Sequence, residues 1–248
     1  MKKLLILLLT IIMALTMAAC GSSSDTSSQD DAAENGQAAE EETAEAAVHP
    51  YAWIGFQDMP ECGYLNALAA NHYYKESDMY IEGMSYVSKQ INAVDGINSY
   101  KENENSKVWS IEGKSLSVNE SSRQYMESDM SDLAENAKEQ YKSAMESGTN
   151  LYGRELKGTG KEAVPIQEED SNEYEYYEYC YPEIEASGDT TVIERYYLKD
   201  GDVYAIYNKT TMGDTVIEST EIIKKISEDI PEGTFDLPDL SDYEKIEL

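Results

Sequence analysis

The sequence predicts an α+β domain in which an antiparallel β-sheet is the main element. Apolar residues recur at every second position in several short segments, which is the period of a half-buried strand. Turn dipeptides such as Asp95-Gly96 and Asp200-Gly201 separate these segments, and one long stretch has helical periodicity. Parallel strands need a helix between each pair, so strands joined by tight turns favour an antiparallel meander.

The amino terminus has the three parts of a secretory signal. Lys2 and Lys3 form a basic start, residues 4–16 are almost wholly apolar, and small residues follow. The apolar run is shorter than the ~20 residues that a membrane-spanning helix needs. We therefore expect residues 1–19 to be a cleaved signal peptide.

The stretch Met17-Ala18-Ala19-Cys20 resembles the lipobox of bacterial lipoproteins. The resemblance implies that Cys20 receives diacylglycerol and becomes the first residue of the mature chain. Two or more acyl chains give stable membrane attachment where one does not. The expected location is the extracytoplasmic face of a bacterial cell membrane, with the lipid on Cys20 as the contact to that membrane.

Residues 20–47 predict a disordered, acidic tether. Between Gly21 and Ala47 there is no Leu, Ile, Val, Met, aromatic or basic residue, so this part has nothing to bury. The remaining residues, 48–248, have the length of one globular domain with its own core.

Composition limits the partners of this domain. The chain has 49 acidic and 19 basic residues and a net charge of −30, which argues against nucleic acid and against adsorption to anionic lipid. No metal-ligand spacing or cofactor motif is present, and we expect neither a metal nor a cofactor. The aromatic residues are 20 Tyr, 2 Phe and 2 Trp, and Tyr suits strands with one wet face.

The first part of the domain predicts one short helix and then a series of strands. Pro60-Glu61 opens the helix, and Tyr64, Leu65 and Leu68 share its buried face. The expected strands and turns follow in this order: strands around Tyr74 and Tyr80 with turns near 76–78 and at Glu82-Gly83, a strand over 86–91, a hairpin turn at Asp95-Gly96, a strand over 108–111, and a turn at Glu112-Gly113 that leads to Leu116 and Val118.

Residues 129–147 predict an amphipathic helix. Its apolar residues recur at intervals of three and four, Ser128 or Asp129 can cap its start, and Gly148 can end it. One stripe should face the sheet. The opposite face is charged and is expected to be solvated.

The segment Glu173–Tyr181 alternates tyrosine with glutamate and predicts a strand with aromatic residues on both faces. Such a strand suits a sheet that is covered on one side and lines a groove on the other; a surface strand with an acidic edge is the alternative. The candidate groove-lining residues are Tyr174, Tyr176, Tyr177, Tyr179, Tyr204 and Tyr207.

The last part of the chain predicts a hairpin and a long strand. Segments 191–198 and 203–207 flank Asp200-Gly201, whose residues supply the positive φ angles of a type I′ turn. A further strand over 215–226 follows a turn at 212–214. Pro231, Gly233 and Pro238 then lead to an acidic end.

Taken together with the lipobox, the meander, the internal helix, the Asp200-Gly201 hairpin and the ending from Ile226 to Pro238 resemble the LolA/LolB type of lipoprotein carrier and receptor. The resemblance implies a strongly curved antiparallel sheet, a half-barrel, with a few helices packed on its concave side. It also implies an apolar cavity for acyl chains. The ligand-contacting positions of that family do not map onto individual residues of this chain.

Cys62 and Cys180 remain after removal of the signal peptide. Outside the cytoplasm such a pair could form a disulfide that closes a loop of more than a hundred residues. Two buried free thiols are the alternative.

The favoured function is a non-enzymatic, membrane-anchored binding protein for a hydrophobic or amphipathic ligand, such as a lipid or an acyl chain, in a sheet-lined cavity. The alternative is a surface or stress-sensing lipoprotein that contacts another envelope protein and has no small ligand. We do not expect an enzyme, because His49 and His72 are the two histidines and neither accompanies a nucleophile motif.

Overall fold

The computed structural model describes residues 47–166, 172–186 and 188–247. The chain divides into two units, Met1–Val48 and His49–Leu248, and the second unit carries the fold. The expected signal peptide, Cys20 and nearly all of the expected tether lie outside the described residues. Within the described part of the chain, no helix combines the length and the apolar character needed to span a bilayer.

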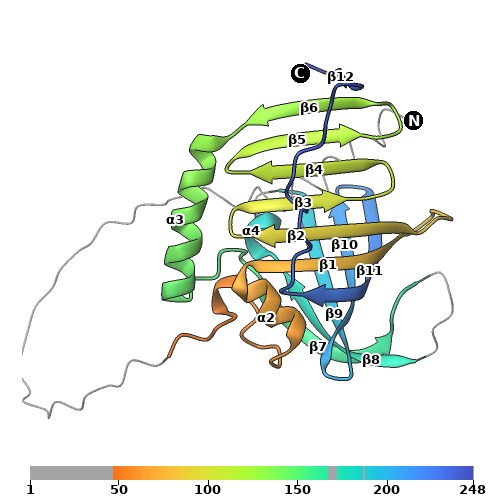
Figure 1. The fold of residues 1–248 in the computed structure, drawn as a ribbon. Coiled ribbons are helices and arrows are strands. Elements are labelled where there is room, and N and C mark those ends of the chain that lie inside the picture. The colour runs from red at the N-terminus through yellow and green to blue at the C-terminus, as the bar shows by residue number, and fades with distance from the viewer. Residues whose placement is uncertain (1–46, 167–171, 187, 248) are drawn as a thin grey trace, which may run out of the picture. The chain divides into compact units, whose positions relative to one another are not determined.

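One large β-sheet is the main element of the second unit (Figure 1). Its strands are β1 (His72–Ile81), β2 (Ser88–Asp95), β3 (Asn98–Glu102), β4 (Ser106–Ile111), β5 (Lys114–Asn119), β6 (Gln124–Asp129), β7 (Glu155–Ala163), β8 (Glu173–Cys180), β9 (Thr190–Lys199), β10 (Asp202–Met212), β11 (Thr215–Ser227) and β12 (Glu244–Lys245). Their order is β12-β6-β5-β4-β3-β2-β1-β11-β10-β9-β8-β7. Neighbours pair antiparallel, except that β12 runs parallel to β6. The predicted α+β class with an antiparallel sheet is confirmed.

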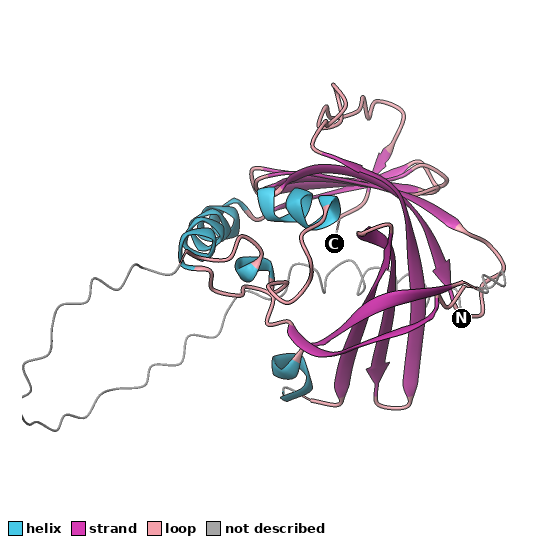
Figure 2. Ribbon diagram, turned by 90° about the horizontal axis from the view of Figure 1, so that it is seen from below, coloured by secondary structure: helices cyan, strands magenta, loops and turns pink. Residues whose placement is uncertain are grey.

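The sheet consists of two meanders, β1–β6 and β7–β11, that meet where β1 pairs with β11. Residues 215–222 of β11 pair with β10, and residues 219–227 pair with β1. Strands β2–β6 run across the view in Figure 1 whereas β9 and β10 run up it, and Figure 2 shows the resulting bend of the sheet. Because β12 and β7 are its outer strands, the sheet is open.

The predicted tight turns at Asp95-Gly96, Glu112-Gly113 and Asp200-Gly201 are confirmed. Asp95-Gly96 joins β2 to β3, and the turns after β4 and β9 each place two successive residues at positive φ. These angles are 49° at Glu112 and 81° at Gly113, and 54° at Asp200 and 83° at Gly201. Two positive φ angles in succession match the right-handed twist of the flanking strands.

The expected turn near 76–78 is wrong, because β1 runs unbroken through these residues. Instead of a turn, a β-bulge between Glu76 and Ser77 shifts the register in which β1 pairs with β11. The strand expected from Tyr86 begins at Ser88, and Tyr86 is exposed in the preceding turn. Strand β6 was not predicted, since its residues lack a clear apolar alternation.

The helices are η1 (Ala52–Ile54), α2 (Gly63–Ala70), α3 (Ser131–Ser147) and α4 (Pro182–Ala186). The short helix expected after Pro60-Glu61 is confirmed as α2, which buries Tyr64 and Leu65. The longer predicted helix is confirmed as α3 and ends at Gly148, whose φ is 72°. In Figure 2 the helices η1, α2 and α3 gather on one side of the bent sheet.

The last residues of the unit form a strap across β1–β5, which we call the C-terminal strap (residues 228–247; Figure 1). Tyr100, Trp109 and Leu116 lie in register on neighbouring strands and are buried beneath it. Trp109 Nε1 donates a hydrogen bond to the Thr234 carbonyl (3.3 Å), and Tyr243 Oη donates to Glu120 Oε2 (2.5 Å). The strap therefore replaces solvent over the apolar face of the first meander.

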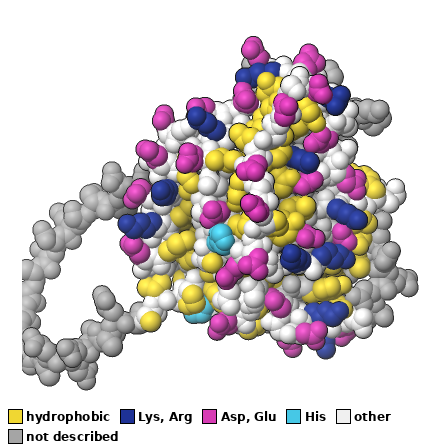
Figure 3. All heavy atoms as spheres, in the orientation of Figure 1, with side chains coloured by type: hydrophobic (Ala, Val, Ile, Leu, Met, Phe, Trp, Pro, Cys, Tyr) yellow, Lys and Arg dark blue, Asp and Glu magenta, His cyan; other side chains and the backbone are white. Residues whose placement is uncertain are grey.

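The surface on this side of the molecule mixes apolar and charged side chains. Figure 3 shows hydrophobic side chains in a band down the middle of the face, with acidic and basic side chains on both sides of it. Charges of both signs lie interspersed there. The acidic excess of the chain is therefore not gathered into a single patch on this face.

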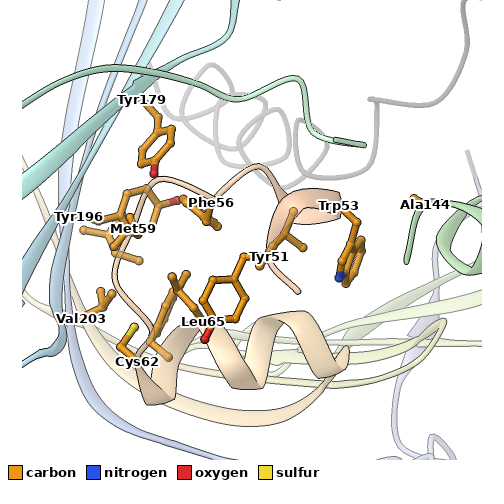
Figure 4. Close-up of a cluster of buried hydrophobic side chains, with 13 residues drawn as sticks. Tyr51, Trp53, Phe56, Met59, Cys62, Leu65, Ala144, Tyr179, Tyr196 and Val203 are labelled. Carbon is orange, nitrogen blue, oxygen red and sulfur yellow. The ribbon is translucent and has the colours of Figure 1, made fainter. Parts of the chain in front are cut away.

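The first residues of the unit form the N-terminal core, which packs on strands β8–β10 (Figure 4). Phe56 is fully buried, and its ring centroid lies 5.0 Å from that of Tyr179 and 4.8 Å from that of Tyr196. The buried members of this core are Tyr51, Trp53, Ile54, Phe56, Met59, Cys62, Tyr64, Leu65, Ala144, Tyr179, Tyr196, Val203 and Ile206.

A third core covers the corresponding face of the second meander. Val164 and Ile166 pack there on Tyr197, Ala205 and Ile222. Thr220 Oγ1 also donates a hydrogen bond to the Pro165 carbonyl at 2.5 Å. The segment after β7 thus covers the apolar face of β9–β11, as the C-terminal strap covers that of β1–β5.

Phe56→Ala should lower the free energy of unfolding by about 3–5 kcal/mol, because it leaves a cavity among closely packed rings. Urea denaturation checks this. Leu237→Ala is the control: Leu237 is 60% exposed, and its truncation should stay within about 0.5 kcal/mol of the original chain. Equal effects of the two substitutions would show that the N-terminal core does not hold the fold together.

Candidate functional site

The six predicted groove tyrosines lie on two different faces of the sheet. Tyr177 and Tyr179 of β8 belong to the N-terminal core, while Tyr174 and Tyr176 belong to the third core. Tyr204 and Tyr207 of β10 share the third core with the latter pair. The strand thus carries aromatic residues on both faces, but the structure does not bring all six into one groove.

Several of these tyrosines have structural partners. The Tyr176 ring lies over Gly160 of the neighbouring strand, where an added Cβ would meet Tyr176 Oη at 2.6 Å. Tyr179 is fully buried, and Tyr174 packs on Tyr204 with ring centroids 5.2 Å apart. Tyr174 alone of the six borders a shallow hollow of about 620 Å³, whose lining is about half polar and includes Lys199 and Asp200.

The carboxylates beside these tyrosines are engaged by Arg195 of β9. Its Nε donates to Glu178 Oε2 at 2.6 Å, and its Nη1 donates to Glu162 Oε1 at 2.7 Å. Tyr197 Oη donates to the same Glu162 oxygen at 2.6 Å. Burial alone would lower the pKa of Arg195, but these bonds and charges raise it. Lys157 Nζ also lies 3.6 Å from Glu178 Oε1, so two basic side chains balance these two carboxylates.

A second arginine, Arg154, ties the N-terminal core to the sheet. Its Nη1 donates to the Ile54 carbonyl at 2.9 Å, and its Nε donates to Tyr181 Oη at 2.8 Å and to Glu194 Oε2 at 3.2 Å. The guanidinium lies 4.6 Å from the centre of the Phe56 ring. These contacts hold residues 51–59 against β8 and β9, so the N-terminal segment itself occupies that face.

A buried ion pair lies at the joint of the two meanders. Lys75 Nζ of β1 lies 2.8 Å from Glu221 Oε1 of β11 and donates a hydrogen bond to Oε2 at 3.0 Å. Ser77 Oγ donates to Glu221 Oε1 at 2.6 Å. Lys75, Ser77 and Glu221 are 8%, 3% and 8% exposed.

Neither partner of this ion pair is a good base for Ser77. Burial would lower the pKa of Lys75 and raise that of Glu221, but their opposite charges and hydrogen bonds outweigh burial. The pKa of Lys75 is therefore raised and that of Glu221 is lowered. A charged ammonium cannot accept a proton from Ser77, and a carboxylate of lowered pKa is a weak base, so the trio is structural.

The same face of the first meander is polar beyond the ion pair. Lys75, Asn92 and Lys101 lie in register on β1, β2 and β3. Burial and the charge of Lys75 lower the pKa of Lys101, and Asn92 Oδ1 is a buried acceptor without a partner among the described residues. An acyl chain would not gain by lying on this row, because it would desolvate charged and amide groups.

The disulfide between Cys62 and Cys180 does not form in this structure, where both are free thiols. Cys62 precedes α2 and is buried in the N-terminal core. Cys180 follows Tyr179 on β8 and therefore points to the opposite face, where its Sγ lies 3.7 Å from the Glu155 carbonyl oxygen.

The expectation that α3 lays a full apolar stripe on the sheet is wrong. Ala144 is its buried residue, and Tyr141 reaches Trp53 with ring centroids 6.1 Å apart. Leu133 is 65% exposed. Figure 1 shows the reason: α3 stands across the ends of the strands and does not lie over a sheet face.

Helix α3 is fastened near both ends. At its start, the Met130 N–H donates to the Gly113 carbonyl at 2.8 Å, and a Cβ on Gly113 would lie 2.7 Å from Ala134 Cβ. Beyond its end, the Leu151 N–H donates to the Trp53 carbonyl at 2.9 Å. These contacts hold the helix at a fixed distance from the strand ends.

Between α3 and the turn that joins β2 to β3 lies a groove of about 370 Å³, which we call the α3 groove. Its lining is almost wholly apolar. The lining residues are Asn71, Gly96, Ile97, Lys138, Tyr141, Lys142, Met145 and Glu146. Sequence reasoning missed this site. The helical stripe with lysines at its border was a signal, but its contact with the Gly96-Ile97 turn depends on tertiary structure.

The two histidines lie apart from each other and from the ion pairs described above. His49 packs on the Tyr51 ring, and His72 Nδ1 lies 3.0 Å from Asp95 Oδ1 at an exposed position. Across the described ranges, no group of three or more His, Cys, Asp or Glu side chains is arranged to hold a metal ion.

Comparison with known proteins adds a distant similarity. No family model and no curated protein sequence matches the chain. Among solved structures, it is similar to one described as an uncharacterized conserved protein from Thermus thermophilus. That match has a TM-score of 0.41 and 7% sequence identity, and it covers 71% of this chain and 90% of that chain.

Glu221→Gln should lower the free energy of unfolding by about 3–5 kcal/mol, because it leaves the buried Lys75 ammonium without its counter-charge. Denaturant unfolding at neutral pH measures the effect. The matched control is the double variant Lys75→Met/Glu221→Leu, which removes both charges and should cost much less.

The ion pair also sets a pH window for stability. The folded pKa of Glu221 is lowered, so its contribution is present above the unfolded value of about 4.3 and disappears as the pH falls through the folded pKa. The folded pKa of Lys75 is raised, so its contribution is present below about 10.4 and disappears as the pH rises. Acid should therefore destabilise the original chain more than the uncharged double variant, and parallel curves would refute the pairing.

Proposed function

We propose that this chain is a membrane-anchored, extracytoplasmic lipoprotein that binds an amphipathic ligand in the α3 groove and performs no catalysis. The observation that carries the proposal is the groove itself, an apolar hollow of about 370 Å³ with a few polar groups on its border. Ligand sites have volumes of roughly 300–1,000 Å³ and the same mostly apolar lining.

The groove is built from side chains that the fold holds in place. Tyr141 is fixed by its contact with Trp53, which is 3% exposed. On the opposite border, Asn71 Nδ2 donates to the Gly96 carbonyl at 3.0 Å, and the Gly96 N–H donates to the Asn71 carbonyl at 2.9 Å. Such a site loses little entropy when a ligand enters it.

The sheet faces favour the groove over a cavity of the LolA/LolB kind. One face of β8–β10 is covered by the N-terminal core, and the corresponding face of β1–β3 carries Lys75, Asn92 and Lys101. We therefore keep the lipoprotein part of the LolA/LolB resemblance and place the apolar chain of the ligand between Ile97, Tyr141 and Met145. We also propose that the bent sheet corresponds to the half-barrel of the LolA/LolB family.

Binding without catalysis fits the state of the buried ionisable groups. Glu221, Glu194 and Glu178 are each bound by a basic side chain. A general acid or base needs a pKa near the working pH and access to substrate. Carboxylates that are held in ion pairs and are largely buried do not give a substrate that access.

Met145→Asp should weaken binding of a photoactivatable dodecyl amphiphile at least tenfold, since a carboxylate in the groove must be desolvated when the chain enters. The full chain in phosphatidylcholine nanodiscs is irradiated, and cross-linked residues are located by mass spectrometry. Labelling should fall within 131–147. The control is Val216→Asp, at a 51% exposed apolar position on β11 outside the groove, which should keep full labelling.

Two outcomes would refute ligand binding in the groove. One is labelling that is unchanged by Met145→Asp. The other is capture of an envelope protein that survives Met145→Asp and disappears when Asp132, Glu135 and Glu139 are reversed in charge. The second result would favour the alternative function, a protein contact through the acidic face of α3.

Cys20→Ser should release the protein from the membrane without changing the unfolding midpoint of residues 49–248, because the lipid is attached outside that unit. Fractionation of cells and denaturant unfolding of the released protein measure the two parts. A Cys20→Ser chain that stays in the membrane fraction after signal cleavage would contradict the anchor.

A further inference from the structure

Resting on the proposed function, we infer that the α3 groove selects a single-chain amphiphile with an anionic head group, and that Lys138 and Lys142 bind this head group. The apolar chain would lie on Tyr141, Met145 and Ile97. This inference adds two points to the proposed function: the charge of the ligand and the two residues that recognise that charge.

The two lysines lie together on the border of the groove. They are four residues apart on α3, so their side chains are neighbours on one flank of the helix, and both line the groove. By helical position they lie between Met145 on the groove side and the acidic residues Glu135 and Glu139 on the solvent side. The border is thus a place where apolar surface meets positive charge along this helix.

In the part of the chain that the structure describes, no carboxylate neutralises either of these two lysines. Within the described ranges, no ion pair within 4 Å involves Lys138 or Lys142. By contrast, Lys75, Lys107, Arg154, Arg195, Lys209 and Lys224 each pair with a carboxylate. Lys138 and Lys142 therefore leave two positive charges, four residues apart, on the border of the groove in a chain whose net charge is −30.

An anionic head group would relieve the repulsion between these two ammonium groups. Like charges four residues apart on a helix destabilise it by a few tenths of a kcal/mol, so a bound anion stabilises the helix as well as the complex. Glu146 also borders the groove, which leaves its three charged residues with one net positive charge. Across the groove, Asn71 and Gly96 are neutral, and the nearby Asp95 carboxylate lies 3.0 Å from His72 Nδ1.

The size of the groove points to one chain. At about 370 Å³ it lies near the lower end of the range for ligand sites, so a single acyl chain suits it better than a two-chain phospholipid. The head group then lies at the border, where it stays partly solvated. A monovalent anion there meets two cationic donors without the full cost of burying charge.

The test compares three photoactivatable dodecyl probes that differ only in head group: a carboxylate, a neutral monoglyceride and a trimethylammonium. The full chain in neutral phosphatidylcholine nanodiscs should bind the carboxylate probe at least tenfold more tightly than the neutral one, and the cationic probe least. The preference should weaken as salt rises, because exposed charges are screened. Acetate alone should not compete, since it lacks the chain.

Lys138→Gln/Lys142→Gln should reduce this preference to within about twofold and leave binding of the neutral probe unchanged. The matched control, Lys89→Gln/Lys114→Gln, removes two exposed lysines from β2 and β5 and should keep the preference. Circular dichroism and the unfolding midpoint should be unchanged in both variants.

The outcomes separate this inference from the proposed function. Equal binding of the neutral and carboxylate probes, both lost with Met145→Asp, would overturn the head-group inference and leave the groove as a ligand site. A preference that survives Lys138→Gln/Lys142→Gln would also overturn it. No labelling of residues 131–147 by any probe, or cross-links between two copies through this helix, would overturn both.

Discussion

The pairing of β1 with β11 is the constraint on which the rest of the structure depends. Each meander is built from neighbours in sequence, but β1 and β11 are separated by more than a hundred residues, and their pairing makes one sheet. The buried pair of Lys75 and Glu221 crosses this joint, and Ser77 reaches the same carboxylate beside the bulge in β1. A buried pair gives specificity because other registers would leave a charge without its partner.

Three local segments then cover the apolar side chains on the faces of the bent sheet. The N-terminal core lies on β8–β10, the C-terminal strap lies on β1–β5, and residues 164–166 lie on β9–β11. The arginines work with these covers: Arg154 bonds the N-terminal segment through the Ile54 carbonyl, and Arg195 joins Glu162 to Glu178 on the third-core side. Most of the buried charge therefore maintains the fold, and the proposed ligand groove lies elsewhere.

Helix α3 forms one border of this groove because the helix is fastened near its ends and not along its length. Gly113 holds its start and Trp53 meets its last turns, which leaves a gap beside the turn at Gly96-Ile97. The apolar residues of the helix thus serve two purposes. Ala144 and Tyr141 secure the helix to the core, whereas Met145 faces the groove.

The features of this protein that follow from sequence patterns are local. Alternating apolar residues and the turns at Asp95-Gly96, Glu112-Gly113 and Asp200-Gly201 determine the hairpins, because φ angles and strand period depend on neighbouring residues. The expected lipobox at Cys20, the expected tether and the helix predicted over 129–147 come from the same kind of short-range pattern, and of these the structure describes the helix.

Only the tertiary structure decided where these elements meet. The polar residues 76–78 predicted a turn but lie within β1, where the side chains of Lys75 and Ser77 bond to Glu221 of the neighbouring strand β11. The six tyrosines look like one groove and are divided between two cores, since strand alternation says which residues share a face but not what covers it. Likewise, Lys138, Lys142 and Met145 become a candidate site only beside Ile97. Pairing across long stretches of chain is set by the balance of burial, charge and register over the whole domain, and no single segment contains that information.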